Sequence, residues 1–241
     1  IEEVFNLDPI IKNKPADSDF DEKVSIEFDH VTFVYPDGEE PVLQDVSFKA
    51  NKGEMIAFIG STGSGKSTLV NLVPRFYDVS SGSIKINGKD IRDYDVLELR
   101  DKLGVIPQKA VLFSGTIADN IRFGKKDASD EEVEYAAKVA QAYPFIMEKE
   151  NGFDEEISEG ATNVSGGQKQ RLSIARALVR KAQIYIFDDS FSALDFKTDA
   201  ILRKELKKEM TESIMLVVAQ RISSIMEADQ IIVLNEHIIN Y

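Results

Sequence analysis

The chain has 241 residues, of which 43% are hydrophobic and 29% are charged, a composition typical of a globular domain with a sizeable core. No apolar run approaches the roughly 18 residues that a membrane span needs, and the lack of cysteine excludes disulfides, thiolate nucleophiles and cysteine-ligated metals. A formal net charge of −13 disfavours nucleic acid as a partner, so any polyphosphate site must be a local feature.

The amino-terminal part predicts a linker followed by an antiparallel sheet. Residues 1–23 are rich in acidic residues and contain two prolines, without sustained periodicity, which indicates a linker that arrives from an upstream segment. The β-branched and aromatic runs at 24–35 and 42–50, split by a turn signal at 36–38, predict antiparallel strands. Residues 83–91 predict a further hairpin beside them.

The middle of the chain predicts a buried strand, a helix and then a helical lobe. Residues 55–60 form an unbroken apolar run that ends in glycine, as a buried parallel strand does, and residues 66–76 continue as a helix. The stretch 109–180 is largely helical in pattern, with acidic residues in the first turn of 130–142 and small apolar residues at helical spacing.

The last third restores an alternation of strands and helices. A strand, a helix and two further strands are predicted, in chain order, at 184–189, 198–210, 214–219 and 230–235. This alternation predicts an α/β fold with a mostly parallel sheet, joined by an antiparallel β subdomain and an α-helical subdomain at about 109–180. The main domain is expected to span 24–241.

A phosphate-binding loop stands between the strand at 55–60 and the helix that follows. The segment from Gly60 to Ser67 matches the pattern G-x-x-x-x-G-K-[ST], and its context is the one that the mechanism requires. Its glycines let several backbone N–H groups face phosphate oxygens, and Lys66 is expected to contact the β and γ phosphates of ATP. The expected nucleotide-binding residues of this loop are Gly60, Ser61, Thr62, Gly63, Ser64, Gly65, Lys66, Ser67 and Thr68.

A magnesium site is predicted beside this loop. The Ser67 hydroxyl is expected to bind Mg²⁺, and Asp188, at the end of the apolar strand 184–189, is expected to hold a water on the metal. Strands that end in aspartate are common, so the prediction for Asp188 depends on the presence of the P-loop upstream. Together these motifs predict a P-loop NTPase of the RecA-like kind.

A second anion site is predicted where Ser165, Gly166, Gly167 and Gln168 begin a helix rich in arginine and alanine. Free N–H groups at this helix start can face a phosphate, although a Gly-Gly turn that merely caps a helix is the alternative. If the two sites lie on different lobes, one ATP cannot use both within one molecule. A head-to-tail dimer, with ATP between the loop of one chain and the helix start of the other, is then the economical arrangement.

This segment, V-S-G-G-Q followed by KQRLSIARALVRKA, resembles the signature of ATP-binding-cassette (ABC) ATPases, and the resemblance extends over about 24–235. It implies that Tyr35 stacks on adenine, although edge packing is the alternative, that Gln108 reaches Mg²⁺, and that Asp195 lies in a loop crossing the dimer interface. The run VLFSGTIADNI is similar to exporter cassettes. Glu159 stands where exporters carry an acidic residue facing the membrane domain, although the surrounding 158–161 departs from their Gly-Glu-Arg-Gly.

The chain departs from the family at two catalytic positions. The glutamate that acts as general base is replaced by Asp189, whose side chain is shorter by about 1.5 Å, and the histidine that contacts the γ-phosphate is replaced by Gln220. Glutamine cannot carry the proton's charge. The two histidines, His30 and His237, lie in other segments. The resemblance therefore implies a degenerate ATP site beside an intact signature, since both departures affect the site on this chain's own P-loop.

The interpretation is one half of a heterodimeric ABC exporter of drugs or lipids, at the cytoplasmic face of the cell membrane. Its partners are a second cassette with a consensus site and the transmembrane domains of both halves, one of which would precede the linker 1–23. Three alternatives stay open: a regulatory ATP-binding clamp without transport, an ordinary homodimeric cassette with slow turnover, and an engineered inactive variant. A cassette of DNA repair or translation is disfavoured by the exporter-like run and the net charge.

Overall fold

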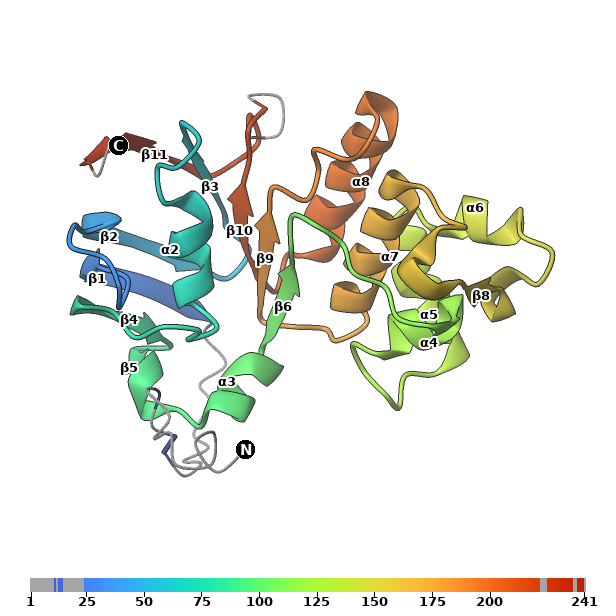
Figure 1. Ribbon diagram of the computed structural model, residues 1–241, viewed down its shortest axis with the longest axis horizontal. Helices are drawn as coiled ribbons and strands as arrows, with labels where there is room; N and C mark the ends of the chain where they lie inside the picture. The colour runs from blue at the N-terminus through green and yellow to red at the C-terminus, as the bar shows by residue number, and fades with distance from the viewer. Residues whose placement is uncertain (1–10, 12, 15–23, 222–224, 236–237, 241) are drawn as a thin grey trace.

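A sheet of six strands forms the centre of the computed structural model, which describes residues 11, 13–14, 24–221, 225–235 and 238–240 (Figure 1). Within these residues the strand order is β12-β11-β3-β10-β9-β6, and every neighbouring pair is parallel except β11 and β12. The strands are β3 (Met55–Gly60), β6 (Leu103–Ile106), β9 (Ile184–Asp188), β10 (Ile214–Val218), β11 (Gln230–Asn235) and β12 (Ile238–Asn240). The predicted α/β fold with a mostly parallel sheet is thus confirmed.

The apolar runs of the central strands are unbroken because both faces of the sheet are covered. In β9, Ile184 and Ile186 belong to the core on the side of the antiparallel sheet, whereas Tyr185 and Phe187 belong to the core on the side of the helical lobe. Figure 1 shows helix α2 on one side of β9 and β10, and helices α7 and α8 on the other.

The predicted antiparallel subdomain is a sheet in the order β2-β1-β4-β5. Its strands are β1 (Ser25–Phe33), β2 (Leu43–Asn51), β4 (Ser81–Ile86) and β5 (Lys89–Asp90). The pairing of β1 with β2 across the turn at 36–38 and the hairpin of β4 with β5 confirm the two predictions for this part. Phe28, Val46 and Ile84 of this sheet share one core with Leu69 of α2, so the sheet packs on the P-loop side of the molecule.

Helix α2 (Lys66–Leu72) is shorter than the predicted helix at 66–76. Pro74 explains the difference, because it offers no N–H to the helix ladder and disfavours a helical conformation at the residue before it. The next residue, Arg75, has a φ of 53° and turns the chain away. The position of Pro74 in the sequence therefore explains why α2 ends early.

The segment 109–180 contains four helices, but its first part, 109–114, forms neither helix nor strand. The helices are α4 (Ile117–Arg122), α5 (Asp130–Val139), α6 (Tyr143–Met147) and α7 (Gly166–Leu178). A two-stranded sheet of β7 (Gly115–Thr116) and β8 (Glu156–Ile157) joins them. Buried Asn120 holds this first part of the segment, because its side chain accepts from the Phe113 N–H at 2.9 Å and donates to the Phe113 carbonyl at 2.8 Å.

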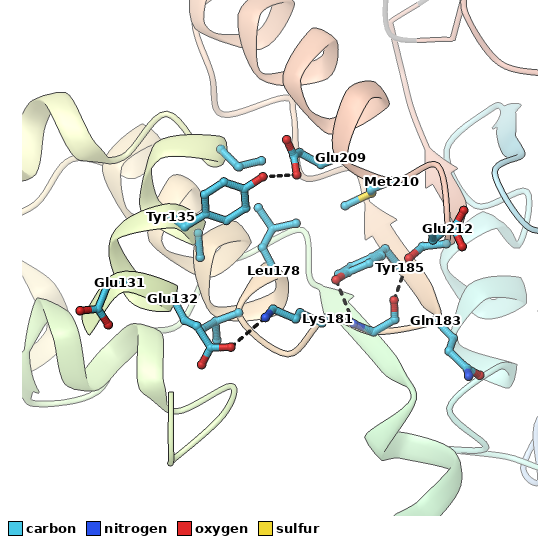
Figure 2. A pocket seen from close by; sticks show the side chains of 15 residues that line it. Glu131, Glu132, Tyr135, Leu178, Lys181, Gln183, Tyr185, Glu209, Met210 and Glu212 are labelled. Atoms are coloured by element: carbon cyan, nitrogen blue, oxygen red, sulfur yellow. Dashed lines mark hydrogen bonds and ion pairs between the residues drawn. The ribbon is translucent and has the colours of Figure 1, made fainter. Parts of the chain in front are cut away.

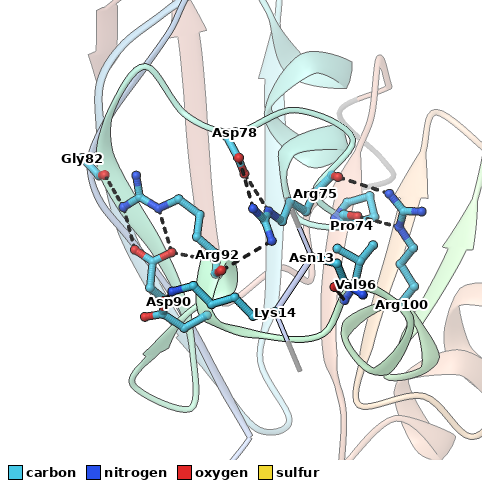
Figure 3. Close-up of polar contacts among 11 residues, drawn as sticks. Asn13, Lys14, Pro74, Arg75, Asp78, Gly82, Asp90, Arg92, Val96 and Arg100 are labelled. Atoms are coloured by element: carbon cyan, nitrogen blue, oxygen red, sulfur yellow. Dashed lines mark hydrogen bonds and ion pairs between the residues drawn. The ribbon is translucent and has the colours of Figure 1, made fainter. Parts of the chain in front are cut away.

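The remaining helices are α3 (Val96–Asp101) and α8 (Phe196–Glu209), and short 3-10 turns lie at Ile91–Asp93, Gly152–Asp154 and Glu159–Ala161. Most of the predicted linker 1–23 lies outside the described residues. Asn13 and Lys14 are described. The Asn13 side chain contacts the start of α3, where it donates to Asp95 at 2.7 Å and accepts from the Val96 N–H at 2.9 Å (Figure 3). Lys14 pairs with Asp93 in the 3-10 turn before α3.

Candidate nucleotide-binding site

The P-loop lines a cavity of about 620 Å³ where the carboxyl ends of β3, β9 and β10 meet. The loop depends on glycine at two positions. A Cβ on Gly60, at a φ of 153°, would lie 2.1 Å from the Leu234 carbonyl oxygen, and one on Gly65, at 89°, would lie 2.9 Å from that of Val42. Gly63 is left-handed too, but a Cβ there would meet no atom, so this part of the loop leaves room for a ligand.

Lys66 is the cation of the cavity. Its ammonium donates to the carbonyl oxygens of Gly60 at 2.9 Å and Ser61 at 2.6 Å and to the Ser64 hydroxyl at 3.2 Å. Burial lowers the pKa of Lys66, against the attraction of two nearby carboxylates. Among the described residues no carboxylate lies within ion-pair distance of this ammonium. A partly desolvated cation over a glycine-rich loop fits the phosphates of a nucleotide.

Ser67 and Asp188 lie together as expected for a magnesium site. The Ser67 hydroxyl donates to Asp188 Oδ1 at 2.8 Å. Burial raises the pKa of Asp188, and the charge of Asp189 adds to the effect. In the described part of the chain, no group of three or more histidine or acidic side chains could hold a metal. One carboxylate and one hydroxyl suit Mg²⁺, which binds through few protein ligands plus substrate phosphates and waters.

The structure brings Gln108, Asp189 and Gln220 together. Both glutamine amides donate to the same oxygen, Asp189 Oδ2, Gln108 at 3.0 Å and Gln220 at 2.8 Å. Asp189 is 7% exposed and has a φ of 47°, a left-handed backbone that aspartate tolerates better than most residues. Burial raises the pKa of Asp189, and the hydrogen bond from Gln108 opposes this shift. His30 instead bonds Asp45 on the antiparallel sheet.

Tyr35 lies at the edge of the cavity, and its ring already has neighbours. Its hydroxyl is 2.9 Å from the Thr68 hydroxyl, and its ring makes edge contacts with Phe33 at 4.8 Å and Tyr77 at 5.3 Å between centroids. The edge packing that was the alternative is thus observed, and stacking of Tyr35 on adenine stays a prediction. Tyr77, which packs on Tyr35 but does not line the cavity, follows α2 in an irregular segment that carries no motif.

Two residues that line the cavity, Val42 and Val218, were missed from the sequence. Val218 could have been found, because it pairs with Asp188 in register and with Phe58, and thus stands at the same edge of the sheet as the P-loop. Val42 precedes β2 and touches the loop at Gly65. Val42 and Gly65 are far apart in the sequence, so no local pattern indicated that Val42 contacts the loop.

The signature residues lie on the other lobe. Ser165 caps α7: its hydroxyl accepts from the Gln168 N–H at 3.2 Å, and the Gln168 side chain accepts from the Ser165 N–H at 2.9 Å. Ser165 and Gly166 are exposed, and a Cβ on Gly167 would lie 3.3 Å from the Ala193 carbonyl oxygen. In Figure 1, α2 and α7 stand on opposite sides of the central strands, so the two predicted anion sites do not meet within the chain.

The other two predicted interface residues are exposed. Asp195 caps α8, accepting from the Thr198 N–H at 3.0 Å, and its carboxylate also accepts from the Thr198 hydroxyl at 2.7 Å. Glu159 lies in a 3-10 turn in front of α7. His237 lies outside the described residues.

The parallel sheet, the antiparallel subdomain and the P-loop at the carboxyl ends of the strands define a P-loop NTPase of the ABC ATPase fold. The family model for the ABC transporter matches residues 43–192, and the chain belongs to this family. Within the described residues, no helix combines the length and the apolar character that crossing a bilayer requires.

Curated relatives and a solved structure agree with this assignment. A putative multidrug export ATP-binding/permease protein of Staphylococcus aureus strain NCTC 8325 is 46% identical over 215 residues, and so is its counterpart in the bovine strain RF122. Each match covers 89% of this chain and 37% of the relative, so the chain spans little more than a third of their length. The structure of a bacterial Atm1-family ABC exporter with ATP bound has a TM-score of 0.94 at 35% identity, covering 100% of this chain and 42% of that one.

Proposed function

We propose that this chain is the ATP-binding cassette of a heterodimeric exporter, with a degenerate ATP site of its own and an intact signature that it supplies to a partner. The observation that carries the proposal is the pair of residues opposite the P-loop. Asp189 and Gln220 stand at the positions of the general base and the γ-phosphate contact, and they are hydrogen-bonded to each other.

The P-loop residues serve to bind and orient MgATP. Lys66 holds the β and γ phosphates, for which it must exchange its present bonds to the loop carbonyls. Ser67 would hold Mg²⁺ through its hydroxyl and Asp188 would hold it through a water. When bound, the metal would supply positive charge beside the phosphate oxygens. Tyr35 positions the adenine at the edge of the cavity.

Slow hydrolysis follows from the environment of Asp189. A general base has to reach the attacking water, and a misplacement of about 1 Å can cost roughly 100-fold in rate. Asp189 has the shorter side chain, and one of its two oxygens already accepts two amide hydrogens. Gln220 supplies a hydrogen bond but no positive charge. Bound ATP is therefore retained in this site.

The signature acts in the other site of the dimer. Because α7 begins on the lobe away from the P-loop, its exposed Ser165 and Gly166 are placed to meet the nucleotide of a second cassette. The curated relatives are named as multidrug export proteins, which supports export of drugs or lipids through the transmembrane domains of both halves. This assembly places the cassette at the cytoplasmic face of the cell membrane.

The experiment that tests the degenerate site restores the two family residues. The wild-type chain should bind MgATP with negligible turnover, and the variant with Asp189→Glu and Gln220→His should hydrolyse ATP at least about tenfold faster in a phosphate-release assay. Each single substitution should give less than the pair, because the two side chains meet in the wild type.

Lys66→Ala in the double variant is the matched control, and it should remove the gained activity. Brisk hydrolysis by the wild-type chain alone would contradict the degenerate site and favour an ordinary homodimeric cassette. A double variant that binds MgATP but stays as slow as the wild type would show that Asp189 and Gln220 are not the cause.

A further inference from the structure

A second cavity of about 510 Å³ lies between the helical lobe and the sheet (Figure 2). It is formed by one face of α5, the end of α7, the start of β9 and the end of α8, and it shares no lining residue with the P-loop cavity. Because the strands are parallel, the start of β9 is the sheet edge opposite the one that carries the P-loop. The nucleotide site therefore does not account for this cavity.

The walls of the cavity are mainly apolar. Ala136 and Val139 of α5 face Leu178 at the end of α7 and Met210 after α8, and Tyr185 of β9 closes the inner side. Burial raises the pKa of Tyr185 to about 12, so its hydroxyl is neutral at physiological pH, where it accepts from the Ala182 N–H at 2.9 Å. A volume of this size lies in the range of about 300 to 1,000 Å³ that drug-sized ligands occupy.

The rim of the cavity is acidic. It carries four carboxylates, those of Glu131, Glu132, Glu209 and Glu212, and one ammonium, that of Lys181. Lys181 is already paired with Glu132 at 2.8 Å, and Glu212 is paired with Lys52.

Glu209, like Glu131, has no ion-pair partner among the described residues of the rim. It accepts the hydroxyl of Tyr135 across the gap between the two lobes, and Figure 2 shows these two side chains pointing toward each other. No lysine or arginine among the described residues forms an ion pair with Glu209. A cation placed here would meet a carboxylate and the ring of Tyr135, which is 53% exposed.

We propose that this interlobe cavity is a binding site for an organic cation with an apolar, aromatic body. The acidic rim repels anions, and the apolar walls offer too few ligands for a hydrated metal ion or a polyamine. A neutral apolar molecule would fill the walls but bring no positive charge to Glu209, whose carboxylate has only the Tyr135 hydroxyl as a hydrogen-bond donor among the bonds described. The ligand would contact the helical lobe and the sheet together, and its binding does not depend on the proposed export function.

The test uses tetraphenylphosphonium, with tetraphenylborate as a probe of the same shape and opposite charge. The chain has five methionines, and ¹³C-methyl labelling gives each a resonance. Tetraphenylphosphonium should shift the Met210 signal in a saturable way and leave that of Met226, which is 75% exposed and does not line the cavity, in place. We expect tetraphenylphosphonium to bind at least about tenfold more tightly than tetraphenylborate.

Two variants separate the cavity from the general negative charge of the chain. Glu209→Gln should weaken tetraphenylphosphonium binding about fivefold to tenfold. Glu134→Gln removes the same charge from α5 outside the cavity, where it pairs with Lys138, and should change the affinity less than twofold. Added salt should weaken binding to the wild type.

Three results would overturn the proposal. The first is no shift of Met210 at millimolar tetraphenylphosphonium. The second is equal affinity for the two tetraphenyl ions, which would make the cavity an unselective apolar one. The third is equal weakening by Glu209→Gln and Glu134→Gln, which would attribute binding to the overall charge.

Discussion

Two adjacent aspartates, Asp188 and Asp189, carry the electrostatic cost of the candidate site. Burial raises the pKa of both, and the charge of Asp189 raises that of Asp188 further. A raised pKa means that the folded chain holds these protons to a higher pH than the unfolded chain does. The free energy of unfolding therefore falls as the pH rises above the unfolded value of 3.8. Such a cost is expected where residues are kept for function rather than for stability.

The substitution Asp188→Asn tests whether the free energy of unfolding falls as the pH rises. The amide oxygen can still accept the Ser67 hydroxyl, while the buried charge is removed, so the variant should be more stable than the wild type by about 1 kcal/mol at pH 7. The gain should shrink toward pH 4, where Asp188 is increasingly protonated in the wild type. Urea unfolding at a series of pH values measures it. Asp37→Asn, at an exposed turn, is the control, and a gain that grows on acidification would refute the explanation.

At the scale of elements, helix α3 depends on a residue about eighty positions upstream. Asp95 caps the helix, accepting from the N–H groups of Leu97 at 2.9 Å and Glu98 at 3.1 Å. The remaining N–H, that of Val96, donates to the Asn13 side-chain oxygen at 2.9 Å. The segment before the first strand thus completes a helix cap, a role that composition alone did not predict.

The cap on α3 also matters for α2, because α3 is tied to the end of the P-loop helix. Arg100 of α3 donates to the carbonyl oxygens of Pro74 at 3.0 Å and Arg75 at 3.2 Å, and Figure 3 shows these bonds beside the Asn13 contacts. Backbone carbonyls left without partners after α2 are satisfied in this way. The amino-terminal segment and the P-loop helix therefore contact the same short element.

Asn13→Ala should uncap α3. We expect a loss of about 1 kcal/mol in local stability, because the Val96 N–H and the Asp95 carboxylate each lose a partner. Hydrogen exchange of the Val96 amide, measured by NMR, should speed up about fivefold. Lys14→Ala removes only an exposed ion pair with Asp93 and should leave the amide nearly unchanged. Equal effects of the two substitutions would mean that charge, not capping, holds the segment.

For the whole molecule, the sheet separates the two anion sites. The P-loop helix packs on one face of the sheet and α7 on the other, and α7 begins at an exposed end. This arrangement supports the proposal that a composite site is completed by another cassette. If the P-loop site is degenerate as proposed, the retained signature would give the two halves of such a pair different tasks.

A partner cassette that is inactive by itself allows the proposed division of tasks to be measured. A second cassette that has glutamate and histidine at the two catalytic positions, but alanine at its own signature serine, should be inactive alone. Mixing it with the wild-type chain should raise ATP turnover on the order of 100-fold, because this chain's signature completes the partner's site. Ser165→Ala in this chain should abolish the gain.

The control for that mixture is Gln168→Ala. It breaks the other half of the capping box on α7 and leaves the Ser165 hydroxyl in place, so it should keep most of the activity. If both substitutions abolish turnover equally, the effect belongs to the stability of α7. If the mixture of the wild-type chain and this partner gives no ATP turnover, the composite-site proposal fails.

The sequence by itself determined β3, β9, β10 and β11 of the central sheet, but not β6, together with the P-loop and the partnership of Ser67 with Asp188, because these depend on local patterns and on parallel strands ending at one edge. The departures at Asp189 and Gln220 were also readable, through family resemblance. Only the tertiary structure decided that Gln108 and Gln220 donate to one oxygen of Asp189. Segments 81 and 31 residues away from Asp189 meet there through the strand order, which no local pattern encodes.

The interlobe cavity and the cap supplied by Asn13 belong to the same class of feature. Each arises where elements that are distant in the chain approach one another. The cavity forms because α5 and the end of α8 do not pack fully. The cap forms because the Val96 N–H is a remaining donor that Asn13 can bind. Periodicity identifies which face of a helix is apolar, but it does not distinguish a face that packs against another element from a face that lines a cavity. The difference lies in how closely the opposite wall approaches, and that distance is a property of the folded chain.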